Sequence, residues 1–204
     1  MLLLGAPALA HAARDVALVS SVSGEVSHIG SGGVPKKARV AMLVQQGDRF
    51  AVTARGTLRV TYLADGRQET WTGPASFRAG TTKSDRIGGH DPRVESLPAA
   101  VPKSLARVPE LIRSANSGKA LRGAKRTRQS LVAGDQADLM AAKVIYARMR
   151  AAAVAEDVTP ELYLFSVPQG YALYDELEPV VADMRRRQPR SDEIQALARS
   201  VSRP

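Results

Sequence analysis

The feature that most constrains the fold is a pair of alternating runs over residues 56–73. The runs are joined by Asp65 and Gly66, and an Asp-Gly pair between alternating segments is a strong signal for a β-hairpin. One side of the first run holds Leu58, Val60 and Tyr62, and the other side holds Arg59 and Thr61. Because successive side chains of a strand point to opposite faces, we expect one face of this hairpin to lie in a core.

Similar short runs surround the hairpin. Gly, Pro and Asp residues separate about seven apolar segments between residues 15 and 80, which is typical of a sandwich or a related all-β fold. The aromatic residues expected in its core are Phe50, Tyr62, Trp71 and Phe77. Helical segments follow this part of the chain. The predicted fold class is therefore α+β, with an N-terminal sandwich-like β domain over residues 15–80 and a small C-terminal helical region over residues 136–204.

The charge of the chain is unevenly distributed. The formal net charge is +9, and residues 81–135 carry eleven Lys and Arg against five Asp and Glu, whereas residues 136–204 carry nine against ten. The basic excess is compatible with an anionic partner such as a polysaccharide, a phospholipid or a nucleic acid. The sequence has no Cys, which excludes disulfides, thiol catalysis and thiolate metal sites.

Residues 1–14 have the features of a secretory signal. An apolar run leads into small residues spaced as a signal peptidase requires, at positions 8 and 10 and again at 10 and 12. No Lys or Arg residue follows Met1 directly, and the alternative interpretation of this segment is a hydrophobic N-terminal strand or tail. The run is shorter than the roughly 20 apolar residues of a transmembrane helix, and no later segment is apolar enough to serve as one. We therefore expect a periplasmic or otherwise exported protein without a transmembrane segment.

Residues 81–135 are expected to form a basic connector. Residues 81–101 are rich in Gly, Pro and polar residues and predict a long loop, and apolar residues at helical spacing predict a helix near 102–114. A run of basic residues without any acidic residue follows, formed by Lys119, Arg122, Lys125, Arg126 and Arg128. Such a run can bind an anionic partner by charge alone, and the alternative is a solvated linker. No aromatic residue lies within this basic run to stack on nucleobases, so a nucleic acid is the least favoured partner.

Residues 136–204 predict several helices. The first carries an apolar stripe through about residue 153, formed by Leu139, Met140, Lys143, Val144, Tyr146, Ala147 and Met149. Thr159 and Pro160 are suited to the start of the next helix, and Ser191 is suited to cap the last one. Five positions weakly resemble the second helix of a tetratricopeptide repeat, in one partial copy: Tyr174, Leu177, Val181, Met184 and Pro189.

Four segments of the β domain occur in an order that resembles the FecR-like domain. They are Val-Ser-Gly-Glu-Val at 22–26, Gln-Gln-Gly-Asp-Arg at 45–49, Leu-Arg-Val-Thr-Tyr-Leu-Ala-Asp-Gly at 58–66 and Gly-Pro-Ala-Ser-Phe at 73–77. The resemblance implies an extracytoplasmic β domain of the bacterial envelope. Membrane-bound members of that family pass an envelope signal to a sigma factor. Their transmembrane helix and cytoplasmic segment are not found in this sequence, so the resemblance is to a stand-alone exported member.

The residues of these motifs have structural explanations, because Gly suits turns with positive φ and Asp side chains bind turn backbone. The residues expected to be structural are Gly24, Gly47, Asp48, Asp65, Gly66 and Trp71. A lone Trp on a strand is more often a core residue than a platform for a sugar ring, and both readings of Trp71 stay open at this point.

No arrangement of residues typical of catalysis is found in the sequence. It has no metal-ligand spacing, no nucleophile elbow and no phosphate-binding loop, so we expect no enzyme activity and no cofactor or metal. The expected function is binding or scaffolding in the bacterial envelope, with signalling through contacts with an envelope protein. The alternative is a module that binds peptidoglycan or an anionic polysaccharide through Trp71 and the basic run. A glycan-processing enzyme is a third hypothesis and would need Asp or Glu side chains that converge in one cleft. The sequence specifies neither the ligand nor the oligomeric state.

Overall fold

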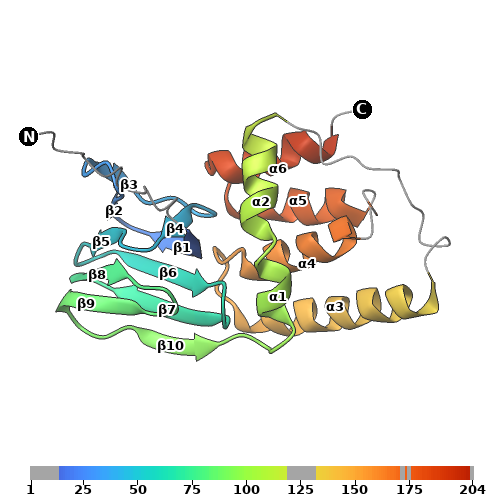
Figure 1. Ribbon diagram of the computed structural model, residues 1–204, viewed down its shortest axis with the longest axis horizontal. Coiled ribbons are helices and arrows are strands. Elements are labelled where there is room, and N and C mark those ends of the chain that lie inside the picture. The colour runs from blue at the N-terminus through green and yellow to red at the C-terminus, as the bar shows by residue number, and fades with distance from the viewer. Residues whose placement is uncertain (1–13, 119–131, 171–172, 174–175, 203–204) are drawn as a thin grey trace, which may run out of the picture.

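A computed structural model describes residues 14–118, 132–170, 173 and 176–202. The chain is α+β, as the sequence predicts, with the strands in the N-terminal half and the helices after them. Figure 1 shows the helices gathered on one side of the β part. The predicted leader and the basic run at residues 119–128 lie outside the described residues, apart from Arg14.

The β part consists of two antiparallel five-stranded sheets. The first sheet has the order β10 (Arg93–Ser96), β7 (Arg67–Thr72), β6 (Thr57–Tyr62), β1 (Asp15–Ser23), β4 (Leu43–Gln45). The second sheet has the order β3 (Pro35–Lys37), β2 (Val26–Ile29), β5 (Arg49–Val52), β8 (Ala75–Ala79), β9 (Ser84–Gly89). Within residues 15–80, where the turn signals predicted about seven strands, the structure has the eight strands β1–β8, and β9 and β10 follow.

Aromatic rings join the two sheets face to face. Trp71 of β7 stacks on Phe77 of β8, with ring centroids 4.4 Å apart, and Phe50 of β5, which lies opposite Phe77 in the second sheet, stacks on it at 5.1 Å. These three rings and Tyr62 are at most 2% exposed. The prediction that all four aromatic residues lie in the core is confirmed, and Trp71 is not accessible to a sugar ring.

The hairpin at residues 56–73 forms as predicted, since β6 and β7 pair with Leu58 opposite Trp71 and Val60 opposite Glu69. The opposite face of the hairpin, which holds Arg59 and Thr61, is also buried. Arg59 is 9% exposed and Thr61 is fully buried, because the helices cover this side of the first sheet. The β6 strand therefore lies in the middle layer of a three-layer arrangement.

The loop predicted for residues 81–101 is wrong over much of its length. β9 adds to the edge of the second sheet beside β8, and β10 then adds to the edge of the first sheet beside β7. The side chains of β9 and β10 are exposed or half-buried. Neither strand has a buried face, so the sequence shows no alternation of apolar and polar residues that would predict a strand there. Polar edge strands of this kind are formed by backbone pairing more than by their side chains.

The helical part follows directly. The predicted helix near 102–114 is two helices, with a break at Ala106 and Arg107. The helices are α1 (Val101–Leu105), α2 (Val108–Asn116), α3 (Ala133–Ala152), α4 (Thr159–Gly170), α5 (Leu177–Arg187) and α6 (Asp192–Ser202).

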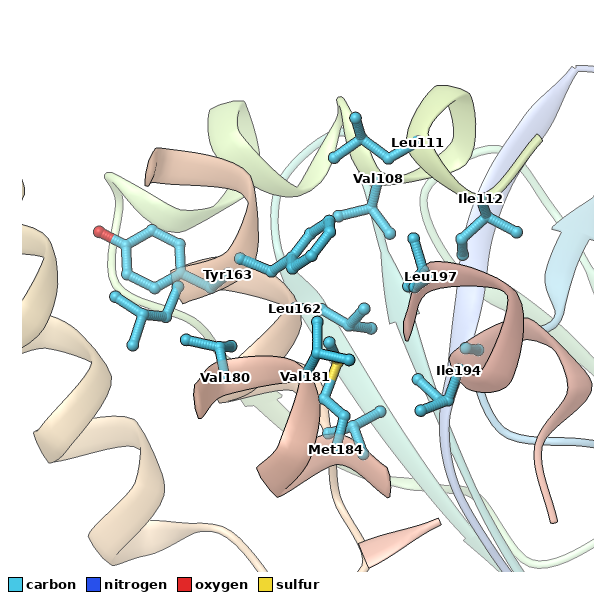
Figure 2. Close-up of a cluster of buried hydrophobic side chains, with 14 of the residues drawn as sticks. Val108, Leu111, Ile112, Leu162, Tyr163, Val180, Val181, Met184, Ile194 and Leu197 are labelled. Atoms are coloured by element: carbon cyan, nitrogen blue, oxygen red, sulfur yellow. The ribbon is translucent and has the colours of Figure 1, made fainter. Parts of the chain in front are cut away.

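The helices share one apolar core, which Figure 2 shows in close-up. Val108 and Ile112 of α2, Leu162 of α4, Val181 of α5 and Leu197 of α6 converge there. The same cluster includes residues of the β part, namely Leu18, Val40, Ala41 and Leu63. The helical region is thus packed on the first sheet and does not hang from it as a separate tail.

Two hydrogen bonds reinforce this contact. The Val158 amide, just before α4, donates to the Ser20 carbonyl of β1 at 3.2 Å. The Ser191 hydroxyl donates to the Val40 carbonyl at 2.8 Å and accepts a bond from the Ile194 amide at 3.3 Å. Ser191 therefore caps α6, as predicted, and also ties that helix to the β part.

Candidate functional site

A cleft opens where the edge of the first sheet meets α3 and α4. Its volume is about 270 Å³, close to the lower end of ligand-binding pockets. Its walls come from both parts of the chain: Leu97 and Pro98 follow β10, Met149 and Ala152 belong to α3, and Pro160 lies in the first turn of α4.

The floor of the cleft is a buried ion pair between the sheet and the helices. An Arg59 terminal nitrogen (Nη1) on β6 lies 2.8 Å from Asp157 Oδ2, and the two side chains are 11% and 1% exposed. The other Asp157 oxygen accepts bonds from the amide of Thr159 at 2.8 Å and from its hydroxyl at 2.7 Å. Asp157, and not Thr159 as the sequence suggested, therefore satisfies the first turn of α4, where a negative charge is favoured.

Neutral polar groups continue this floor across the sheet. The Gln68 side-chain amide donates to Thr159 Oγ1 at 3.2 Å and to Thr61 Oγ1 at 3.0 Å. Thr61 Oγ1 in turn donates to the Ser20 hydroxyl at 3.2 Å. All of these groups are buried and bonded, which is the condition under which a buried polar network is stable.

The rim of the cleft carries charges that are closer to solvent. Glu95 of β10 lies 2.7 Å from Arg93 and 3.6 Å from Arg59, with 37% of its side chain exposed. Arg148 of α3 is exposed at the mouth. Hydrogen-bonding groups and a cation therefore surround a small apolar space, an arrangement suited to holding a ligand or a side chain of a partner.

The carboxylates near the cleft are engaged in ion pairs. Asp157 binds Arg59, and Glu95 binds Arg93, so each has a stabilising partner. No group of three or more His, Cys, Asp or Glu residues suited to a metal ion is found in the part of the chain that the structure describes. With these residues, the cleft can bind and orient a group.

A second buried carboxylate holds the helices together. Glu161 of α4 is fully buried and lies 3.2 Å from an Arg150 nitrogen of α3 and 3.1 Å from the Arg187 Nε of α5. Tyr146 donates its hydroxyl proton to Glu161 at 3.4 Å, and burial together with the Glu161 charge raises the pKa of Tyr146. This network fixes α3 at its C-terminal half.

The outward side of α3 is unusual in composition. The stripe predicted from the sequence combined two opposite faces of the helix. Leu139 and Met149 are buried against the other helices, whereas Met140 is 58% exposed and Val144 is 52% exposed. We define the α3 outer face as the exposed, uncharged residues Ala133, Ala137, Met140, Val144, Ala147 and Ala151.

The α3 outer face follows a regular spacing. Its residues recur at alternating intervals of four and three along the helix, which is the pattern of a coiled-coil seam. The solvent side of a surface helix normally carries charged residues, so an apolar exposed stripe needs an explanation. Figure 1 shows α3 at the lower border of the helical part, with its N-terminal half extending away from the sheets.

The structure brings the predicted motif residues together only as parts of turns and the core. Gly24, Gly47 and Gly66 have φ values of 70°, 93° and 73°. Asp48 accepts a bond from the Gln45 amide and Asp65 accepts one from the Arg67 amide, both at 3.0 Å. At Gly66 a Cβ atom would also press on Pro102 at the start of α1, so this glycine permits the helix to approach the hairpin.

Most of the cleft was not predicted from the sequence. The sequence placed Arg59 and Thr61 on the side of the hairpin opposite its expected core face, and it did not single out Asp157. The only signal for the cleft was that Arg59 and Thr61 alternate with apolar strand residues. This pattern is equally compatible with an exposed strand face and with a buried polar face. The contact between His28 and Asp48 was not predicted either. The His28 Nε2 and Asp48 Oδ2 atoms are 2.9 Å apart, but they are not aligned as a hydrogen bond.

Two further observations bear on the class of protein. No helix among the described residues has the length and hydropathy to cross a membrane. Comparison of the chain with protein-family models, with curated proteins and with solved structures finds no match. The fold and the site define an α+β chain with a cleft at its internal interface and an uncharged outer helix face.

Proposed function

We propose that this chain is a non-enzymatic, extracytoplasmic binding protein of the FecR-domain type, which contacts another envelope protein through the α3 outer face. The observation that supports the proposal is that exposed, uncharged residues recur from Ala133 to Ala151 at the spacing of a helix–helix seam. Contiguous apolar surface of this kind marks interaction sites on folded proteins.

The rest of the molecule supports this role by fixing α3. Glu161 holds the helix through Arg150, and the Arg59–Asp157 pair holds the α4 end of the helical part on the sheet. A rigidly held helix loses little conformational entropy on binding, which favours affinity. The mechanism is contact without turnover.

A photo-reactive side chain placed at residue 144 tests this function directly. In cells that export the protein, illumination is expected to give a discrete adduct with another protein. The matched control is the same side chain at residue 87, since Ile87 is 58% exposed on β9, away from α3. Equal adducts from both positions, or none from residue 144, would exclude the α3 outer face as the contact surface.

The alternative function is binding to peptidoglycan or an anionic polysaccharide. Burial of Trp71 removes the stacking platform that this hypothesis used. Its remaining basis is charge, from Lys119, Arg122, Lys125, Arg126 and Arg128 outside the described residues. Co-sedimentation with purified sacculi that is lost at high salt would support this alternative, and no co-sedimentation would exclude it.

A further inference from the structure

We propose that the partner of the α3 outer face is an amphipathic helix whose apolar stripe is flanked by acidic residues. This inference rests on the protein-binding function proposed above and specifies the chemistry of the partner. It is carried by three observations: the length and spacing of the face, the size of its residues, and the charges along its borders.

The length and spacing select a helix as the occupant. The face runs from Ala133 to Ala151, which is about 27 Å of helix at 1.5 Å per residue. The four-three spacing keeps one stripe facing one partner over this length, and a second helix presents side chains at the same spacing. The four Ala residues permit close approach of a partner backbone, while Met140 and Val144 supply larger apolar contacts near the middle.

The size of these residues argues against a lipid surface. Helices that lie in the membrane interface combine basic borders with large apolar groups such as Trp, Phe and Leu. The α3 outer face has none of these three residue types. Its apolar area is therefore better suited to packing against a helix than to insertion among lipid chains.

The borders of the face carry bases. On one side lie Lys143 and Arg150, which are already paired with Glu176 and Glu161 of the helical part. On the other side Arg148 is exposed, and beyond it a shallow groove of about 370 Å³ is bordered by Lys103 and Arg107. Among the described residues, Asp138 is the acidic residue that lines this groove, and Glu95, already paired with Arg93, lines the cleft together with Arg148. The second border is thus mainly basic, and it complements an acidic border of a partner.

The same charges disfavour a second copy of this chain as the occupant. In a parallel pair, the heptad positions would bring Lys143 opposite Arg148 of the copy. In an antiparallel pair centred on the face, Lys143 would lie opposite Lys143 of the copy. Each arrangement juxtaposes like charges, and the net charge of +9 adds to the repulsion.

Three synthetic peptides test the proposal. They share one seam of Leu and Ala at heptad spacing, and their border positions are all Glu, all Gln or all Lys. Binding to the full chain is measured by fluorescence anisotropy of the labelled peptides. We expect the Glu peptide to bind at least about tenfold more tightly than the Lys peptide, and its affinity to fall as salt is raised.

Matched variants locate the binding. Val144→Glu is expected to abolish binding of the Glu peptide, whereas Ile87→Glu, an equally exposed site on β9, leaves it unchanged. Arg148→Glu is expected to weaken binding several-fold, and Arg55→Glu in the turn before β6 serves as its control. Circular dichroism of each variant establishes that the helices are retained.

The outcomes separate this inference from the function on which it rests. Equal binding of the three peptides overturns the acidic partner but leaves a helix-binding face. No binding of any peptide also overturns the inference, while the adduct at residue 144 independently decides the proposed function. Binding to anionic phospholipid vesicles that Val144→Glu abolishes would assign the face to lipid. Self-association that the same variant abolishes would assign it to a second copy.

Discussion

The Tyr62 hydroxyl lies inside the β sandwich, 2.9 Å from the Ser84 hydroxyl and near the buried Glu69 carboxylate. Glu69 is held by Arg67 Nε at 2.6 Å and by the Trp71 indole nitrogen at 3.3 Å. Burial raises the pKa of Tyr62 far above its usual value, and the Glu69 charge raises it further. The neutral form of Tyr62 beside the buried Glu69 carboxylate therefore contributes to the stability of the folded core.

This raised pKa predicts a loss of stability at high pH. In the unfolded chain Tyr62 loses its proton near its usual pKa of about 10, while in the folded chain it keeps it. The unfolded state then binds fewer protons, so the free energy of unfolding falls as the pH rises above about 10. Tyr62→Phe loses the bond to Ser84, at a cost of about 1 kcal/mol near pH 8. Denaturant unfolding of both proteins at about pH 8 and about pH 11 should show this gap shrinking; a constant gap would contradict the raised pKa.

Two adjacent residues of α3 provide a test of the revised helix orientation. Leu139 is 1% exposed in a cluster with Leu173, and Leu139→Ala is expected to cost about 3 kcal/mol of unfolding free energy. Met140 is 58% exposed, and Met140→Ala is expected to change it by less than about 0.5 kcal/mol. Chemical denaturation measures both values, and similar losses for the two variants would return Met140 to the core.

At the scale of elements, the Arg59–Asp157 pair joins β6 to the beginning of α4. Asp157→Asn keeps the shape of the side chain but leaves the Arg59 charge buried, with only Glu95 at 3.6 Å to offset it. Breaking one side of a buried ion pair costs about 3 kcal/mol or more. We expect that loss in the unfolding free energy. The control is Asp192→Asn in the exposed pair with Arg39, which should cost less than about 1 kcal/mol. Equal costs would mean that the cleft floor contributes no more than a surface contact.

The elements also mark how far the sequence could predict the fold. The period of two in β6 and the Asp-Gly turn predicted the hairpin correctly, because both signals are local. The burial of Arg59 and Thr61 was not predictable in this way, since it depends on Asp157, which follows Arg59 by 98 residues. A local pattern shows which residues alternate along a strand. It does not show which distant segments of the chain pack on each face.

β9 and α3 were misread for other reasons. In β9 the residues are mostly polar and end in Gly88 and Gly89, which are turn signals; Gly89 has a φ of 82° and passes so close to the backbone of β8 that no Cβ fits. In α3 apolar residues occupy two faces, so a single stripe drawn through Leu139, Met140 and Met149 crosses from the buried face to the exposed one. The exposed face of α3 can be recognised only once the packing of its buried face is known.

At the scale of the whole molecule, the helical part and the first sheet share one core. Leu18 and Leu63 of the β part pack among the helices, and Ser191 and Val158 bond to the backbone of the β part. The cleft and the position of α3 both depend on this contact. The two parts of the chain therefore form one cooperative unit, which presents the α3 outer face.

A single cooperative unit is expected to lose its sandwich and its helices in one unfolding transition. The only Trp of the chain, Trp71, lies in the β core and reports on the sandwich through its fluorescence, while far-ultraviolet circular dichroism reports mainly on the helices. In one denaturant titration, we predict that the two signals change with the same midpoint and the same slope. Loss of the helical signal at a lower denaturant concentration, with the Trp71 fluorescence still native, would contradict the claim.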